Sequence, residues 1–175
     1  MLGKKRKSAE DPQVVKVYTT NPDLLWADAH PEPRLGPLVI TIMIKECFKE
    51  VYGYDLEIEQ FGKPTEFTYN YVEKHLRQTA SNKGVEISNF YMIGDNPESD
   101  IAGAIKKGWT SILVKTGVFD PDAKTSVNGN DSKFPATYVV EDFAEAIDLI
   151  FRLEALERVP LPPITEQRQQ PITAG

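Results

Sequence analysis

The sequence predicts an α/β fold in which a mostly parallel sheet lies between helices, and three observations predict it. Short apolar runs alternate with helix-like segments, as in chains that form parallel sheets. Polar clusters follow three of these runs, at Thr19–Asn21, Gly62–Lys63 and Gly94–Asn96. The 175 residues, of which 41% are hydrophobic and 26% charged, are enough for one globular domain.

The first half of the chain contains two predicted strands and two predicted helices. Val14–Tyr18 is an apolar run that ends at a Thr-Thr-Asn-Pro turn, which is typical of a strand. A helix is expected after Pro37 as far as Val51, with Gly53 as its stop, although the β-branched residues near its start favour helix less. Leu56–Phe61 alternates apolar and polar residues, which predicts a strand. Residues 65–80 then show helical spacing of their apolar side chains.

The second half continues the alternation of strands and helices. Ser99 is a candidate N-cap and Gly108 a candidate C-terminal stop for a short helix between two strands. The expected elements are strands at Asn89–Ile93, Thr110–Val114 and Thr137–Val140, helices at Ser99–Lys107 and Glu141–Glu157, and a polar loop over residues 120–136.

This core, residues 14–158, is expected to lie between two disordered segments. Residues 1–13 form a basic arm that contains Lys4-Lys5-Arg6-Lys7, which is either a solvated run of charges or a nuclear import signal. Residues 159–175 are rich in proline and should not fold. No apolar run reaches the roughly 18 residues that a membrane-spanning helix needs, so no span is expected.

The composition excludes some classes of partner and of metal site and bears on the cellular compartment. The net charge of −6 argues against nucleic acid as the main partner. A single cysteine, Cys47, excludes an internal disulfide and a multi-cysteine metal site, and its apolar helix predicts an inert core thiol. His75 lies on the predicted inner face of its helix, which favours packing over catalysis. The expected location is intracellular, either cytoplasmic or mitochondrial, although no Arg- and Ser-rich presequence is evident.

The segment after the third strand is the strongest candidate for chemistry. Asp95 and Asp100 are five residues apart and would point about 140° apart on a continuous helix. A turn at Pro97 could instead bring both carboxylates and Asn96 towards one point. Such a set suits Mg²⁺, which binds one or two carboxylates together with water and phosphate oxygens. The alternative is an ordinary loop in which Asp100 favours a helix dipole.

Two further strand ends carry weaker signals. Lys63, after a glycine and before a proline, could hold a phosphate or screen a carboxylate, but it could equally be a surface lysine. Thr20 and Asn21 offer hydroxyl and amide groups to a substrate, or simply bond their own turn. Because strands of a parallel sheet bind ligands at their carboxyl ends, these clusters are expected to lie together.

Read together, these segments resemble the haloacid-dehalogenase (HAD) superfamily of hydrolases. Gly62-Lys63-Pro64 is similar to its motif III, and the run from Ile93 to Ala104 is similar to motif IV and highly specific. The opening Tyr18–Trp26 looks like the post-cap loop of the class IIA, NagD-like branch. Residues 23–36 are most similar to the cat-eye-syndrome-critical-region type. The resemblance covers roughly residues 14–158 and implies a Rossmann-like core.

The resemblance also implies a mechanism. Members of the family usually transfer phosphate to an aspartate with Mg²⁺ present and then hydrolyse the aspartyl phosphate. By match, Lys63 would steady the nucleophile and the phosphate of a phosphorylated small molecule. Asp95 would ligate Mg²⁺, with Asp100 and Asn96 in the same metal site, and the Thr20-Asn21 loop would face the substrate.

The chain departs from the family in an important respect. The resemblance implies an Asp-x-Asp motif that supplies the nucleophile, and we expect this motif to be absent from the whole chain, as is a counterpart of the cap domain. The strand that carries this motif lies centrally in the family's sheet. We therefore expect a partial core that is inactive alone unless a partner chain supplies the strand. A non-catalytic binding or regulatory module and an unrelated receiver-type domain are the alternatives.

Overall fold

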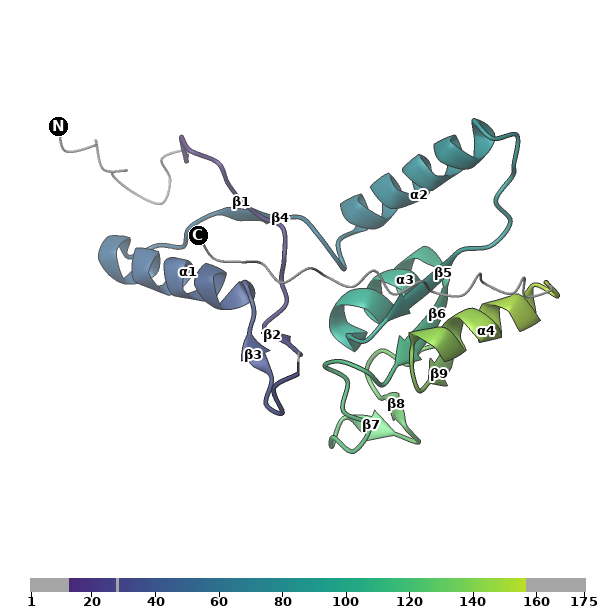
Figure 1. Cartoon of the computed structure of the whole chain (residues 1–175). Coiled ribbons are helices and arrows are strands. Elements are labelled where there is room, and N and C mark those ends of the chain that lie inside the picture. The colour runs from purple at the N-terminus through teal and green to yellow at the C-terminus, as the bar shows by residue number, and fades with distance from the viewer. Residues whose placement is uncertain (1–12, 28, 157–175) are drawn as a thin grey trace, which may run out of the picture.

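The computed structural model describes residues 13–27 and 29–156, and Figure 1 shows how their elements are arranged. Short parallel strands lie among four α-helices, so the predicted α/β class is confirmed. Apart from Gln13, the predicted basic arm lies outside the described residues, as do residues 157–175 with the Pro-rich tail.

The first strand and the strand before the lysine form one small parallel sheet. Strand β1 (Val17–Thr19) pairs with β4 (Ile58–Gln60), with Val17 opposite Ile58. Helix α1 (Leu38–Tyr52) lies between them in sequence and ends, as predicted, at Gly53, whose φ of 76° is left-handed. Two-residue strands β2 (Leu25–Trp26) and β3 (Arg34–Leu35) form an antiparallel pair that the sequence did not predict.

A second sheet of three parallel strands contains the core. The order is β5 (Tyr91–Gly94), β6 (Thr110–Val114) and β9 (Tyr138–Val140), so β6 is central and is the most buried strand. Helices α3 (Ala102–Lys107) and α4 (Phe143–Leu153) accompany it. Two apolar clusters form the core, one of Ile112, Val114, Val140 and Ala146, the other of Ile101, Leu113, Phe119 and Ala136.

A π-helical turn, η1 (Pro97–Ile101), begins the segment that continues into α3. The backbone carbonyl of Asn96 accepts hydrogen bonds from the amides of Asp100 (2.8 Å) and Ile101 (3.4 Å). Asn96 is the N-cap, and its side chain accepts a 3.0 Å bond from the Glu98 amide. The prediction of Ser99 as N-cap was wrong because Pro97, whose fixed φ suits a first helical residue, begins the helix earlier.

The segment predicted as a polar loop, residues 120–136, contains a small hairpin. Strands β7 (Ser126–Val127) and β8 (Asn130–Asp131) pair antiparallel. Asn128 (φ 53°) and Gly129 (φ 75°) make the turn between them, in the Asn-Gly sequence that two-residue hairpins favour. The loop prediction was therefore incomplete.

Helices α1 and α2 (Glu66–Ser81) bury little of their apolar surface within the described part of the chain. Helix α1 has no buried residue, so Cys47 is exposed and the prediction of a core thiol was wrong. In α2 only Tyr69 is buried. His75 is exposed and stacks on Tyr71 at 6.3 Å between ring centroids, so its predicted packing was also wrong. The helical periodicity was right, but no described element covers that face.

The two parallel sheets are separate, as Figure 1 shows. Within the described residues, β1 pairs only with β4, and β5 pairs only with β6. One edge of each strand is therefore left without a ladder partner in this part of the chain. No helix in the described ranges is long and apolar enough to cross a membrane.

Candidate functional site

The carboxyl ends of β1, β4 and β5 meet, as the sequence predicted for its three polar clusters. Gly62 follows β4 with a φ of 85°, and a Cβ atom there would lie closer than 3.0 Å to the backbone carbonyl of Thr20. Only glycine allows both the left-handed backbone and this close approach. The glycine therefore places Lys63 beside the loop that follows β1.

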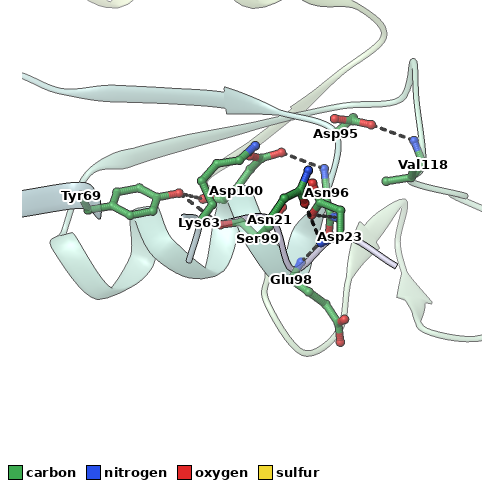
Figure 2. A network of polar contacts seen from close by, with 10 residues as sticks. All are labelled: Asn21, Asp23, Lys63, Tyr69, Asp95, Asn96, Glu98, Ser99, Asp100 and Val118. Carbon is green, nitrogen blue, oxygen red and sulfur yellow. Dashed lines mark hydrogen bonds and ion pairs between the residues drawn. The ribbon is translucent and has the colours of Figure 1, made fainter. Parts of the chain in front are cut away.

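Lys63 forms an ion pair with Asp100, with 2.5 Å between Nζ and Oδ1 (Figure 2). The Asp100 side chain is only 3% exposed, whereas the lysine side chain is 44% exposed. A carboxylate so deeply buried needs a compensating charge, and Lys63 supplies it while still reaching solvent. The pair joins two segments that are 37 residues apart in the sequence.

The backbone around β5 fixes the direction of the Asp100 carboxylate. Its second oxygen, Oδ2, accepts a 3.1 Å hydrogen bond from the Asn96 amide. Gly94 lies beneath it, and a Cβ atom at Gly94 would come closer than 3.0 Å to the carboxylate. Asp100 is thus held by a lysine, an amide and a glycine surface at once.

The Asp95 carboxylate is held by a different part of the chain. Its Oδ2 accepts a 2.8 Å bond from the Val118 amide, and Figure 2 shows it turned towards Val118. A Cβ atom at Gly117, whose φ is 143°, would lie closer than 3.0 Å to it. The loop after β6 therefore orients Asp95, whereas Lys63 orients Asp100.

These donors fit magnesium bound jointly with a phosphate. No set of three His, Cys, Asp or Glu side chains that could hold a metal occurs in residues 13–27 and 29–156. The described residues therefore do not form a metal site made of protein ligands alone. Mg²⁺ usually takes one or two carboxylates and completes its shell with water and phosphate oxygens. Asp95 offers one carboxylate of that smaller set at the carboxyl end of β5, whereas the Asp100 oxygens accept bonds from Lys63 and from the Asn96 amide.

The loop after β1 contacts the motif IV segment through Asp23, which was not among the predicted site residues. The Asp23 carboxylate accepts a 3.2 Å bond from the Asn96 side-chain amide. Asn21 accepts a 2.8 Å bond from the Asp23 backbone amide, which is a local turn of the kind considered as its alternative role. Thr20 contributes its backbone carbonyl beside Gly62. Asp23 follows Pro22 in the motif, and this turn chemistry was the available signal for it.

A second overlooked residue, Tyr69 of α2, supports the π-helical turn. Its hydroxyl lies 2.9 Å from the Asp100 carbonyl and 3.2 Å from the Ser99 carbonyl and donates its proton to them. Burial, and then the nearby negative charge of Asp100, raise the pKa of Tyr69 above its usual range. The hydroxyl therefore stays protonated and remains a donor.

A cavity of about 590 Å³ adjoins these residues. The loop after β1, the start of η1 and the β7–β8 hairpin region contribute to its walls. Apolar lining comes from Pro22, Leu24, Leu25, Leu38, Val118 and Phe119, and polar lining includes Asp23, Asn96, Glu98, Ser99 and Asp120.

One Asp-x-Asp pattern does occur in the chain, at Asp120-Pro121-Asp122, so the expectation that the chain has none was wrong. It follows β6 and not an N-terminal strand. The Asp120 carboxylate accepts a 2.9 Å bond from the Asp122 amide, so it shapes its own turn. Its place after the motif IV segment differs from that of the family's nucleophile motif.

Comparison with known proteins gives a consistent assignment. The HAD-hydrolase-like family model matches residues 60–146. A cardiolipin synthase (CMP-forming) / mitochondrial hydrolase fusion protein of Schizosaccharomyces pombe is 39% identical over 150 residues, covering 84% of this chain and 24% of that protein. A mitochondrial hydrolase of Saccharomyces cerevisiae is 32% identical over 168 residues, covering 84% of this chain and 46% of that protein. The chain thus spans less than half the length of both.

A solved structure shows the same fold. A possible sugar phosphatase of the HAD superfamily from Cytophaga hutchinsonii matches with a TM-score of 0.55 and 24% identity, over 74% of this chain and 42% of that chain. The likeness shows an α/β fold of the HAD type, and the family model and the relatives show the hydrolase family. The chain belongs to the HAD-like hydrolases, with a class IIA, NagD-like fold.

Proposed function

We propose that this chain provides the lysine and magnesium half of a HAD-type phosphatase site and that the aspartate nucleophile comes from outside the described residues. The Lys63–Asp100 pair is the observation that supports this most directly, because it joins motifs III and IV at 2.5 Å. The substrate class would be a phosphorylated small molecule.

In the proposed reaction, an oxygen of the aspartate nucleophile attacks phosphorus, the ester P–O bond breaks, and the alcohol leaves with a proton from the second aspartate of the Asp-x-Asp motif. That second carboxylate then takes a proton from water, whose oxygen attacks phosphorus. The bond between phosphorus and the first aspartate breaks, which releases free phosphate and restores the nucleophile. Splitting one displacement into two lowers each barrier. Lys63 would bind a phosphate oxygen and hold the nucleophile in position. Mg²⁺, when bound, supplies charge neutralisation; Asp95 would ligate it and Asp100 and Asn96 would support its shell.

We further propose that an added polypeptide segment pairs with the free edges of β1 and β5. Both sheets are parallel, and the carboxyl ends of β1 and β5 meet through the 3.2 Å Asp23–Asn96 bond. An intervening parallel strand would therefore end at the candidate site. The segment would come from a partner chain or from further sequence of the same protein.

The compartment proposed for this chain is intracellular, either cytoplasmic or mitochondrial. The mitochondrial option is favoured by the names of the two yeast relatives, one a mitochondrial hydrolase and the other a fusion protein that includes one.

The deciding experiment is hydrolysis of para-nitrophenyl phosphate with millimolar Mg²⁺. The pure chain is expected to show negligible turnover, and mixing it with a polypeptide that carries the Asp-x-Asp strand of a class IIA relative should restore activity. Lys63→Ala should lower the restored rate by about 10²-fold or more. Lys83→Ala, on an exposed turn after α2, is the matched control and should leave it unchanged.

Turnover by the pure chain alone would contradict catalytic incompleteness. A chain that binds the added segment and Mg²⁺ but never turns over would favour the non-catalytic binding module.

A further inference from the structure

We propose that Tyr69 is a positioning residue whose hydroxyl fixes the π-helical turn and thereby aims the Asp100 carboxylate at Lys63. The inference deepens the proposed function, since it concerns how the same site is held. Tyr69 lies outside the lysine and motif IV segments and reaches the site from α2.

The π-helical turn receives a hydrogen-bond donor from another helix. Residues in such a turn bond five positions along the chain in place of four, as the amide of Ala102 does to the Pro97 carbonyl. This spacing disturbs the regular pairing of the carbonyls that follow. The Tyr69 hydroxyl lies within hydrogen-bond distance of two of them, at Ser99 and Asp100. A buried carbonyl without a partner would cost free energy, so the hydroxyl stabilises this turn over a regular helix.

The ring of Tyr69 is closely packed, which holds the hydroxyl near the two carbonyls. It packs against Trp109 at 5.4 Å between ring centroids and is 3% exposed. Gly103 provides the space, because a Cβ atom there would come closer than 3.0 Å to the ring. Tyr69 therefore contacts α3 at Gly103, about one helical turn after Asp100.

The same helix also holds the lysine loop. One residue before Tyr69, the Thr68 hydroxyl accepts a 2.9 Å bond from the Gly62 amide, and Thr65 donates a 2.6 Å bond to the Gly62 carbonyl. The first turns of α2 thus bind the backbone next to Lys63 and the backbone of Asp100 together. We infer that α2 sets the separation of the two charged groups.

The test compares Tyr69→Phe with Tyr91→Phe. Tyr69→Phe keeps the ring and removes only the hydroxyl. Tyr91 is the matched control, because its hydroxyl donates to the Glu154 carboxylate at the opposite end of β5. Two readouts are measured: the Mg²⁺ dissociation constant from thermal melts at increasing Mg²⁺, and the NMR shift of the Asn96 amide, which donates to Asp100.

Tyr69→Phe is expected to weaken Mg²⁺ binding about tenfold, as loss of an outer support of a metal ligand does, and to move the Asn96 amide signal. Tyr91→Phe should lower the melting temperature without either effect. Unchanged Mg²⁺ affinity and an unmoved Asn96 signal in Tyr69→Phe would overturn the role of Tyr69. If the wild-type chain shows no Mg²⁺ response at all, the proposed function fails, and the Asn96 signal still decides whether Tyr69 positions Asp100.

Discussion

At the scale of single residues, two glycines make room for the two carboxylates of the candidate site. Gly94 lies under Asp100 and Gly117 lies under Asp95, each so close that a methyl group would overlap the carboxylate. The motif therefore depends on the absence of side chains as much as on their presence. Such close approach is a use of glycine that no other residue can replace.

Gly94→Ala should displace the Asp100 carboxylate and abolish the Mg²⁺-dependent rise in melting temperature. Overpacking of this kind should also lower the free energy of unfolding by about 1–3 kcal/mol. Gly53→Ala is the control, because it strains the backbone at φ 76° but meets no atom within 4 Å. Its Mg²⁺ response should persist, and a persisting response in Gly94→Ala would contradict the assignment of Asp100 to the metal site.

At the scale of elements, α4 is the most clearly specified helix. Asp142 is its N-cap and accepts a 2.9 Å bond from the Glu145 amide, while the Glu145 side chain accepts a 2.9 Å bond from the Glu141 amide. Ala146 in its first turn is fully buried against β6 and β9. The cap and the packing therefore fix the same end of the helix.

Asp142→Ala should lower the free energy of unfolding by about 1 kcal/mol, because the Glu145 amide loses its acceptor. Asp142→Asn keeps an acceptor oxygen and should cost much less. Chemical denaturation of both variants measures the difference, and equal losses would show that the cap bond contributes nothing.

The elements differ in how far the sequence predicts them. The strand at Thr110–Val114 has the predicted bounds, because the apolar β-branched and leucine residues at 112–114 lie between the two breaks at Gly108 and Gly117. The two-residue strands β2 and β3 contain too few residues to carry a pattern. The exposed face of α2 was expected inside, since periodicity reveals a stripe but not whether another element covers it.

The candidate site also contains residues that the sequence predicts and contacts that it does not predict. Lys63, Asp95, Asn96 and Asp100 were singled out because their motifs are local in the sequence. The Lys63–Asp100 bond and the support from Tyr69 join segments 37 and 31 residues apart, and only the fold brings these together.

At the scale of the whole molecule, apolar side chains remain exposed over two helices. Large hydrophobic residues usually bury most of their surface in a finished core. Here the exposed ones in α1 and α2 include Ile40, Ile42, Met43, Ile44, Val51, Phe67, Tyr71 and Leu76.

The pure chain should therefore bind the dye ANS strongly under native conditions, because so much apolar surface meets water. Adding the polypeptide that restores activity should lower the dye fluorescence and raise the melting temperature together. Dye binding that the added segment leaves unchanged would contradict the proposal that it covers this surface.

The π-helical turn has a consequence for how sequences of this type can change length. Each residue advances a helix by about 100°, so the extra residue at Pro97–Ile101 sets the phase between Asp100, which faces Lys63, and Ile101 and Ala104, which face the core. Deleting one residue from this turn would keep all the other residues of the motif. It would still rotate the Asp100 carboxylate away from Lys63. The number of residues from Asn96 to Ala104 therefore determines whether the carboxylate faces the lysine. In related sequences this number is as informative about the site as the identity of the residues.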